Sequence, residues 1–240
     1  MSNSNPSVDP ANSNTLYGLL VHFFKKKMSE FDFCTPAKVV SFDRNKNRAS
    51  IVSQIKMIGT NNEQFSKKSI ASVPVYNAGG GGFILSFPLK AGDLGWLIAN
   101  DSDISLFLNQ YNEQIPNTER VHSFSDGFFL PDPMTGYTIA GEDSANVTLQ
   151  NLSGDVKITL SNNSVKIKTP SNVTIESPQI DLKGNVKVDG TLTVTGETTL
   201  EQNLKVEGNS AVDGNELVLG NIASGANITA TGTITPGTPP

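Results

Sequence analysis

Short apolar bursts separated by polar residues dominate the second half of the chain. Within each burst Val, Ile and Leu take two or three alternating positions, the period of a β-strand with one buried face. The bursts lie at residues 147–149, 156–160, 165–167, 173–175, 180–182, 186–188, 192–194, 204–206 and 217–219. Ser, Asn, Pro, Gly or Asp ends each burst before it reaches ordinary strand length. The pattern predicts a repetitive β array in which one repeat cannot bury its own apolar face.

Three intertwined copies of the chain satisfy this pattern best. A single chain wound from such strands would have a thin core and many open strand edges, which promote aggregation. Three copies around one axis pair every strand with neighbouring chains, while small β-branched residues fill a narrow interior. We therefore predict a homotrimeric triple-stranded β-helix or prism, about 50 Å long for about ten layers. One alternative is a monomeric β-solenoid, although such folds usually have a more regular period and a capping element. The other is a disordered polar tail, but the persistent alternation of Val and Ile argues against it.

The first half begins with a polar segment and one amphipathic helix. Residues 1–14 are rich in Ser, Asn and Pro and are expected to form a loose arm. The apolar residues that follow recur at helical spacing, which predicts a helix of about four turns; they are Leu16, Leu19, Leu20, Phe23, Phe24 and Met28. Asn14 or Thr15 is the expected N-cap. The lysines at 25–27 lie near the C-terminal end, where positive charge is favoured, and form a solvated helix end or, alternatively, a docking site.

Residues 35–115 have the pattern of a small β-barrel. Turn-forming segments separate runs that are typical of strands. These runs are 39–42, 51–58, 70–76, 83–87, 94–99 and 104–108. Five or six strands over a segment of this length favour a barrel of the OB-fold type. Four consecutive glycines at 79–82 are expected to form a hairpin tip, because neither the Lys-Ser/Thr pair nor the helix of a phosphate-binding loop follows them.

Residues 112–137 contain several prolines and turn-forming pairs, which predict an irregular connector. His122 and Asp126 lie four residues apart in it. As a catalytic pair they would need a nucleophile, and the sequence marks none, so a structural hydrogen bond is the expected role. Cys34 is the only cysteine. It excludes an internal disulfide and is expected to be a small buried side chain.

Composition divides the chain near residues 138–146. All 17 aromatic residues and the cysteine lie at or before Tyr137. Residues 141–240 carry 6 lysines and 11 acidic residues, whereas residues 1–140 carry 12 basic and 12 acidic residues. The acidity argues against a nucleic-acid partner, since phosphate contacts need clustered Lys and Arg. No apolar run approaches the length of a membrane span, and the polar N-terminus does not have the pattern of a secretion signal.

The order of these elements resembles the central spike proteins of contractile-tailed bacteriophages, in the short class without a lysozyme domain. The segment VPVYNAGGGGFILSFPLKAGDLGWLIANDSDISLFL is similar to the family's N-terminal barrel, including an F-P-L/V-x-x-G-D turn that contains Gly92 and Asp93. RVHSFSDGFFLPDP resembles its H-x-x-x-D-G/A-F-x-x-P connector. The matching positions of the connector are His122, Asp126, Gly127, Phe128 and Pro131. The resemblance extends over residues 30–235.

This resemblance implies a homotrimeric structural protein rather than an enzyme. The barrel would attach to the tail tube and baseplate hub, and the rod would pierce the host outer envelope when the sheath contracts. The expected location is the baseplate tip of the virion, with the host cytoplasm as the place of assembly. The expected segments are an arm and helix at 1–30, the barrel at 31–115, the connector at 116–145, the rod at 146–227 and a tip segment at 228–240.

One feature of such spikes is missing from this sequence. Many of them end in a tip where H-x-H pairs from three chains bind iron octahedrally. Here His22 and His122 are the only histidines, so no such site is expected at the C-terminus and no cofactor is expected. A separate small tip protein is the favoured cap, and a blunt tip closed by the chain itself is the alternative. The candidate docking positions are Ile228, Thr231, Ile234 and Pro236.

Three other functions compete with a phage spike. A spike from a secretion or tailocin machine would have the same fold and mechanics. A receptor-binding or polysaccharide-degrading fibre needs aromatic residues for sugar stacking and paired carboxylates, and the rod has carboxylates such as Asp181 and Asp189 but no aromatic residue. A nucleic-acid binder with a trimerising tail is disfavoured by the neutral barrel.

Overall fold

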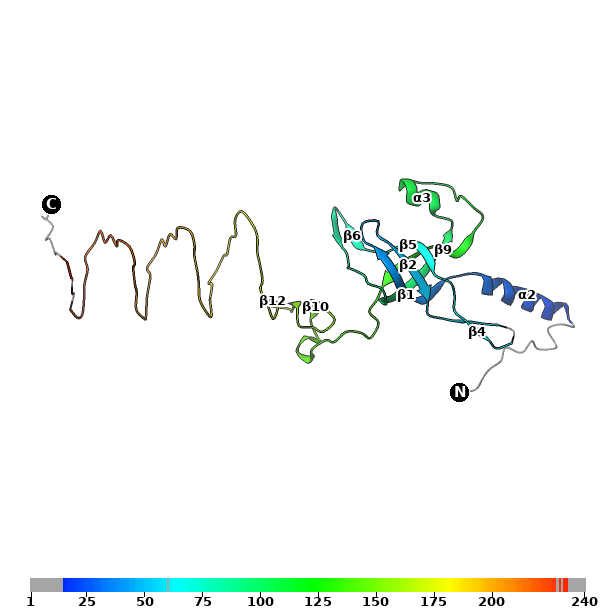
Figure 1. Ribbon diagram of the computed structural model, residues 1–240, viewed down its shortest axis with the longest axis horizontal. Coiled ribbons are helices and arrows are strands. Elements are labelled where there is room, and N and C mark those ends of the chain that lie inside the picture. The colour runs from blue at the N-terminus through cyan, green and yellow to red at the C-terminus, as the bar shows by residue number, and fades with distance from the viewer. Residues whose placement is uncertain (1–14, 60, 228, 230, 233–240) are drawn as a thin grey trace. The chain divides into compact units, whose positions relative to one another are not determined.

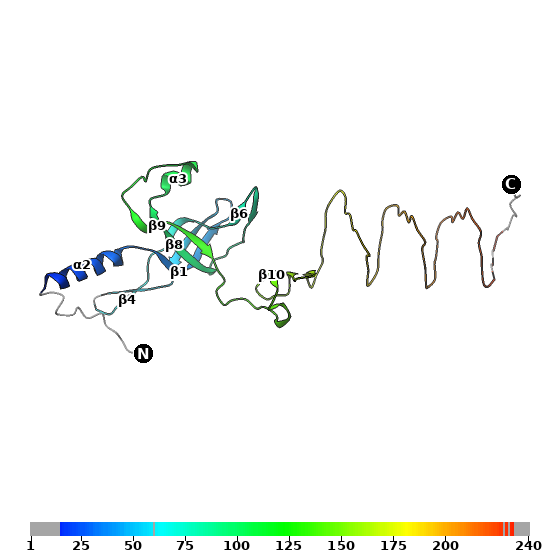
Figure 2. The same ribbon diagram turned by 180° about the vertical axis from the view of Figure 1, so that it is seen from behind.

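The computed structural model describes residues 15–59, 61–227, 229, 231 and 232. The chain divides into two compact units, Met1–Ile175 and Glu176–Pro240, which are treated separately below. The first unit is mainly β, with few helices, and Figures 1 and 2 show it from opposite sides.

Helix α2 (Leu16–Glu30) confirms the helix that the apolar spacing predicts. Thr15 is its N-cap, and the Thr15 hydroxyl oxygen accepts a hydrogen bond from the backbone N–H of Gly18 at 3.0 Å. Near the other end, Lys27 Nζ lies 2.9 Å from Glu30 Oε2. The large apolar side chains of α2 are exposed; they are Leu16, Tyr17, Leu19, Leu20, Phe23, Phe24 and Met28.

Five strands form a nearly closed, barrel-like sheet in the order β5-β2-β1-β8-β9. These strands are β1 (Cys34–Asp43), β2 (Arg48–Ser53), β5 (Ile70–Pro74), β8 (Leu94–Ser102) and β9 (Val121–Pro131). All neighbours in this order pair antiparallel. The two outer strands meet beyond the end of β5, where Val75 forms a parallel bridge with Phe129 and Tyr76 N donates to Phe129 O at 2.8 Å. Figure 1 shows the strands wrapped into this arrangement.

Alternating side chains of the sheet fill the barrel. The buried apolar residues are Ala37, Val39, Ala49, Ile51, Val73, Val75, Leu97, Phe124 and Phe129. The expectation that Cys34 is buried is wrong, because the thiol is exposed. The period of two along β1 places Thr35 and Ala37 on the inner face and Cys34 on the outer face.

Two small hairpins stand apart from the barrel sheet. The predicted run at 51–58 is divided between β2 and β3 (Met57–Ile58), which pairs with β4 (Gln64–Phe65). The glycines at 79–82 lie in the hairpin of β6 (Ala78–Gly80) and β7 (Phe83–Leu85), as expected. Gly81 and Gly82 have φ values of 59° and 87°, which glycine adopts without steric cost.

Two expectations for residues 104–137 are wrong. The run at 104–108 is not a strand but lies largely in helix α3 (Ser105–Gln110). Asp103 starts this helical turn, because its Oδ1 accepts the Ser105 N–H at 2.9 Å, and Tyr111 ends it in a left-handed conformation. The segment expected to be an irregular connector contains β9, which is the 11-residue edge strand of the barrel sheet. Pairing with β8 gives this Pro- and Gly-containing segment its strand structure, which local propensity did not indicate.

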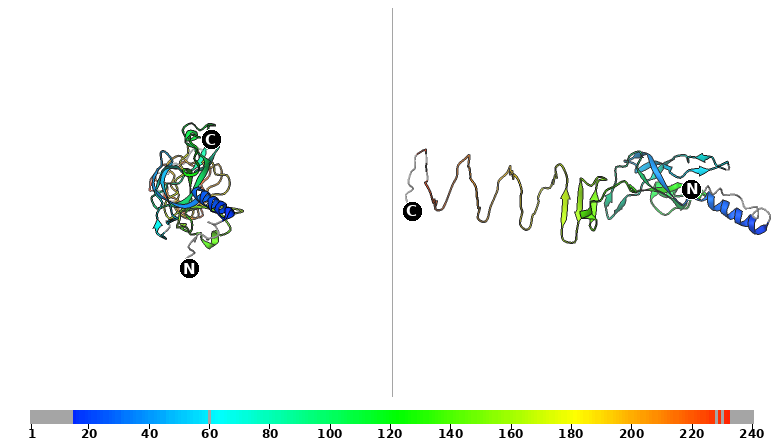
Figure 3. Two further views of the ribbon diagram at one scale, coloured as in Figure 1. Left: turned by 90° about the vertical axis from the view of Figure 1, so that its right-hand side faces the viewer. Right: turned by 90° about the horizontal axis from the view of Figure 1, so that it is seen from below.

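A separate three-stranded sheet follows the barrel. It consists of β10 (Val147–Gln150), β11 (Lys157–Leu160) and β12 (Val165–Lys168), and it confirms the first three predicted bursts. Figure 3 (right) shows these strands side by side. A short 3-10 helix, η1 (Gly141–Asp143), precedes them. In the second unit, none of the described residues belongs to a strand, and Figure 1 shows their trace winding back and forth.

Candidate functional site

The turn at residues 90–93 ties β8 to β1. Lys90 N donates to Asp93 Oδ2 at 2.7 Å, and Asp93 N donates back to Lys90 O at 3.1 Å. Gly92 has a φ of 101°, a conformation that favours glycine. Gly92 N and Asp93 O pair with the carbonyl and amide of Val39, both at 2.9 Å. These two motif residues therefore form a structural turn.

His122 anchors the end of α2 to the barrel. Its carbonyl accepts the Asp32 N–H at 2.7 Å, and its ring lies 5.1 Å from the Phe33 ring and 5.5 Å from the Phe31 ring, centroid to centroid. Asp32 in turn accepts the Phe124 N–H at 3.1 Å. The hydrogen bond expected between His122 and Asp126 is not formed. The carboxylate nearest to His122 is Asp101, with Nδ1 and Oδ1 3.9 Å apart.

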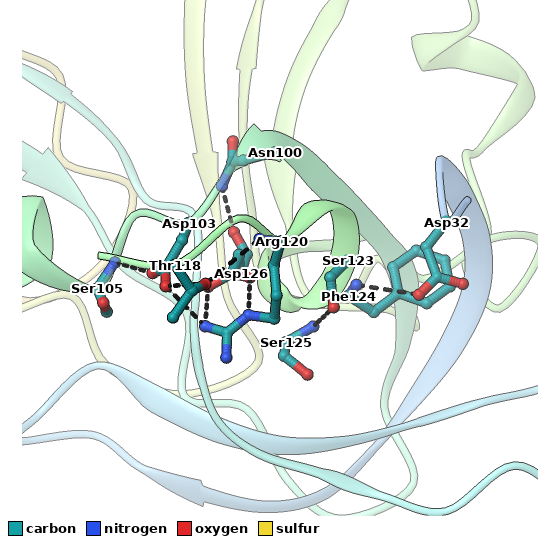
Figure 4. Close-up of polar contacts among 10 residues, drawn as sticks. All are labelled: Asp32, Asn100, Asp103, Ser105, Thr118, Arg120, Ser123, Phe124, Ser125 and Asp126. Atoms are coloured by element: carbon teal, nitrogen blue, oxygen red, sulfur yellow. Dashed lines mark hydrogen bonds and ion pairs between the residues drawn. The ribbon is translucent and has the colours of Figure 1, made fainter. Parts of the chain in front are cut away.

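Asp126 belongs to a cluster centred on Arg120 (Figure 4). The guanidinium binds Asp126 with two hydrogen bonds of 2.9 and 3.0 Å, and Nη2 also reaches Asp103 Oδ2 at 3.0 Å. Thr118 donates to the same Asp103 oxygen at 2.7 Å. Both carboxylates are buried, while the Arg120 side chain is half-exposed. The cluster holds the segment that contains α3 against β9.

Electrostatics in this cluster favour the ionised form of Asp103. Hydrogen bonding from Ser105 and Thr118 lowers the pKa of Asp103 far below its ordinary value, and the charge of Arg120 adds to the effect. The neighbouring Asp126 raises the pKa of Arg120 by hydrogen bonding and by its charge. The hydrogen-bonding capacity of the two carboxylates is directed at partners within the chain. The arrangement indicates structural clamping of the fold.

Gly127 and Pro131 fit the packing of β9 against β8. A side-chain carbon added at Gly127 would lie 2.4 Å from Ile98 O, so only glycine allows the two backbones to approach this closely. Pro131 is the last residue of β9 and lies opposite Gly95. All six motif residues thus have roles in the turns and packing of the barrel, and the structure gathers them around β8 and β9 without making one pocket of them.

The β10–β12 sheet has an inverted distribution of polar and apolar side chains. On one face, apolar residues lie directly opposite each other across the strands, and all six are exposed; they are Val147, Leu149, Ile158, Leu160, Val165 and Ile167. The other face contains the polar residues Lys157 and Thr159, which are buried. A soluble monomeric sheet normally covers its apolar face.

An ion pair holds the polar face to the segment before the sheet. Lys157 Nζ contacts the carboxylate of Asp143 in η1, and it lies 3.3 Å from Glu142 Oε1. Hydrogen bonding from Lys157 lowers the pKa of Asp143, and hydrogen bonding to Asp143 raises the pKa of Lys157. In addition, Thr138 N donates to Leu152 O at 3.0 Å. The chain itself therefore covers the polar face and leaves the apolar face open.

Residues 184–232 have a six-residue period that the apolar alternation alone did not indicate. Gly occupies seven of nine positions spaced by six: Gly184, Gly190, Gly196, Gly208, Gly214, Gly220 and Gly232, with Gln202 and Ala226 at the other two. The described chain bends at each of these positions. Every described residue of the second unit is exposed, including its Val, Leu and Ile residues.

The structure describes only one of the four candidate docking positions in the expected tip segment. Ile228, Ile234 and Pro236 lie outside the described residues, and Thr231 is exposed. The part of the chain that the structure describes contains no group of three or more His, Cys, Asp or Glu residues suited to a metal ion. No helix in that same part is long and apolar enough to cross a membrane.

Residues 35–132 match the family described as phage protein Gp138 N-terminal domain. The matched segment covers the barrel from β1 to the residue after β9, including all six motif residues. No curated protein matches the chain. The match indicates a phage protein and is consistent with a tail or baseplate component of the virion.

Proposed function

We propose that this chain is the central spike of a phage tail baseplate, a homotrimer that pierces the host outer envelope when the sheath contracts. The observation that carries the proposal is the open apolar face of β10–β12, followed by a long acidic segment whose described apolar residues are exposed in one chain. The segment that precedes the sheet already covers the polar face of the sheet. Burial of the apolar face therefore requires other chains.

Three copies around one axis would enclose this surface. The proposed interior residues are mainly Val, Leu and Ile, without any aromatic residue, which suits a narrow interior. Pairing between copies also removes the open strand edges of the isolated chain. The result is a stiff rod of the triple-stranded kind predicted from the sequence.

The barrel is proposed to join the rod to the tail tube and hub. Its five strands and partial closure are the arrangement of an OB-fold. Large apolar side chains remain exposed on α2 and on the β3–β4 hairpin, where Met57, Ile58 and Phe65 are open. Lys67 follows β4 and Asp32 follows α2, and Lys67 Nζ lies 3.7 Å from Asp32 Oδ1. The two elements therefore leave the barrel at neighbouring points. Such clustered apolar surface favours a protein partner.

The proposed mechanism is mechanical and needs no catalytic residue. The contracting sheath supplies the work, and the rod transmits it to the envelope. The Arg120 cluster stiffens the barrel through its buried carboxylates, as the Asp143–Lys157 pair does at the start of the rod. A small tip protein on the last residues remains part of the proposal, as does an alternative role in a tailocin or secretion machine with the same mechanics.

The solution mass of the full-length protein tests the trimer. We expect three times the 25.6 kDa chain mass by light scattering. Ile158→Asp, in the centre of the open apolar face, should reduce the mass to that of a monomer or abolish soluble protein. Asn163→Asp introduces the same charge in the β11–β12 turn, where the side chain is exposed, and should leave the trimer intact. A wild-type monomer, or an unchanged trimer in Ile158→Asp, would contradict the trimeric rod.

The place in the virion requires a separate test. Antibodies against residues 15–30 or an added peptide tag, viewed by immunogold electron microscopy, should label the end of the tail. Particles made without this chain should contract but fail to release their contents into cells. Label on the capsid or on lateral fibres would contradict the spike function, even if the protein is a trimer.

A further inference from the structure

An open cleft of about 580 Å³ lies between three parts of the barrel. Its lining comes from the β1–β2 turn and β2, from β5, and from the segment that contains α3 and the start of β9. In five-stranded barrels of this type, the loops after the first and fourth strands commonly flank a ligand surface. Here these loops are residues 44–47 and 103–120, and both contribute to the cleft. None of the lining residues belongs to α2 or to the β3–β4 hairpin, so the cleft is distinct from the apolar surface of those elements.

Arg48 reaches the cleft from the start of β2. Its Nη1 donates to Ser72 O at 3.1 Å, and its guanidinium has no carboxylate partner among the residues that the structure describes. Ser72 has a φ of 60°, a left-handed conformation that is uncommon outside glycine. It lies where the pairing of β2 with β5 shifts register. Strained backbone of this kind often occurs at ligand sites, and here it holds an arginine whose remaining N–H groups are open to a ligand.

Arg120 adds a second set of N–H donors. Its Nε and Nη2 bind the carboxylates of Asp103 and Asp126, whereas Nη1 has no partner among the described residues (Figure 4). Asp126 also lines the cleft, but both of its oxygens already accept hydrogen bonds from Arg120. Lys46 is the third cation of the lining, and its Nζ lies 3.8 Å from Asp43 Oδ2. The charged groups that the cleft offers to a ligand are therefore mainly N–H donors.

The charge and the side chains of the cleft favour a peptide over a nucleic acid. Asp43, Asp103 and Asp126 balance the charges of the three cations, so the cleft has no excess charge to attract a polyanion. The N–H donors can still bind one carboxylate at short range, because the planar guanidinium matches the geometry of a carboxylate. None of the described lining residues is aromatic, so the stacking surface that bases need is missing. Ile104 and Leu108, both half-buried, form an apolar part of the lining.

We propose that this cleft binds a short peptide segment of a partner protein. One Asp or Glu carboxylate of the segment binds Arg48, with Arg120 Nη1 as a second donor in the same cleft. A neighbouring apolar side chain of the segment packs on Ile104 and Leu108. The cleft is formed within one chain, so this recognition does not need the trimer. That the partner belongs to the baseplate rests on the proposed function.

Fluorescence anisotropy with the full-length protein tests the recognition chemistry. The probe is the peptide Gly-Leu-Glu-Leu-Gly with blocked ends and an uncharged dye, and the matched peptide has Gln in place of Glu. We expect the Glu peptide to bind with a dissociation constant below about 1 mM. The Gln peptide should bind at least about tenfold more weakly, because it lacks the charge-assisted hydrogen bonds to the arginines.

Variants of the protein place the binding in the cleft. Arg48→Gln should weaken binding of the Glu peptide at least about tenfold. Arg44→Gln removes the same charge from an exposed position of the same turn that does not line the cleft, and should leave binding unchanged. The urea midpoint from Trp96 fluorescence shows whether each variant is folded. Asn109→Asp, at an exposed lining position, should also weaken binding by repulsion, whereas Asn112→Asp outside the lining should not.

The possible results separate this cleft from the spike function. Equal affinity for the two peptides, or no binding up to about 5 mM, would overturn the peptide site. Tighter binding of a labelled oligothymidylate strand, with an affinity that falls steeply as salt increases, would overturn it in favour of a nucleic-acid ligand. Neither result changes the expected place of the protein in the virion. Immunogold label on lateral fibres would remove the spike function and leave the peptide measurements standing.

Discussion

Gly127→Ala is expected to destabilise the barrel strongly, because two backbones meet at this position. The added carbon would lie 2.4 Å from Ile98 O and 3.1 Å from Ile98 C. Ordinary van der Waals contact starts near 3.4 Å, so β8 and β9 would have to separate locally by about 1 Å. Gly127 is buried and lies beside the irregularity in the β8–β9 pairing, which leaves no flexible side chain to move aside.

The magnitude follows from two contributions. Forced overpacking costs about 1–3 kcal/mol, and each ladder hydrogen bond that weakens adds about 1 kcal/mol. We expect the free energy of unfolding of the barrel to fall by about 3 kcal/mol. With a urea dependence of about 1.5 kcal/mol per molar, the unfolding midpoint falls by about 2 M.

Trp96 provides the assay for this prediction. It is the only tryptophan, and its indole N–H donates to Asp132 Oδ2 at 2.9 Å beside the end of β9. Its fluorescence during urea unfolding therefore reports on the barrel and not on the rod. Gly80→Ala is the matched control, since Gly80 is also in a strand but an added carbon would meet nothing within 4 Å. An unchanged midpoint in Gly127→Ala would refute the reasoning.

Three further predictions concern charge and the rod. The fold lowers the pKa of Asp103, so the ionised carboxylate stabilises the barrel above the unfolded pKa of about 3.9. This contribution to the free energy of unfolding should be lost as the pH falls further. Trp96 fluorescence during urea unfolding measures the loss. Arg120→Leu leaves two buried carboxylates facing each other without their cation, so it should lower the urea midpoint of the barrel at neutral pH; an unchanged midpoint would contradict the ion pairing. Gly208→Val should lower the melting temperature of the full-length protein if the proposed trimer brings another copy close to this position, because one chain alone has space for the side chain, whereas Asn209→Val at the next residue should not.

The helix and most barrel strands could be predicted from local patterns. The spacing of Leu16, Leu20 and Phe24 and the cap at Thr15 are local signals, and the structure confirms both. The structure likewise confirms the strands predicted from alternating apolar residues at β10 to β12, because each of these strands pairs with the next strand in the sequence. The match to a phage domain over residues 35–132 extends over the barrel and is consistent with the phage origin that the sequence resemblance implies.

The functional assignment of His122 and Asp126 could not be predicted in the same way. Their spacing of four indicated a pair with each other, but the bulge in the β8–β9 pairing separates them. Asp126 then meets Arg120, six residues away, and His122 meets the aromatic rings before β1. The residues at 104–108 became helical for a similar reason, because the Asp103 carboxylate accepts the Ser105 N–H at the start of α3 while it also binds Thr118 and Arg120.

The sequence by itself determined where the chain alternates, where it bends and which half lacks aromatic residues, because these depend on backbone period and on side-chain chemistry. Only the tertiary structure decided that β9 is an edge strand of the barrel and that Lys157 lies buried against Asp143. It also decided that the apolar face of β10–β12 is the open one. Long-range pairing and burial choose among conformations that local sequence leaves nearly equal in free energy, and here they buried the polar face of this sheet instead of the apolar one.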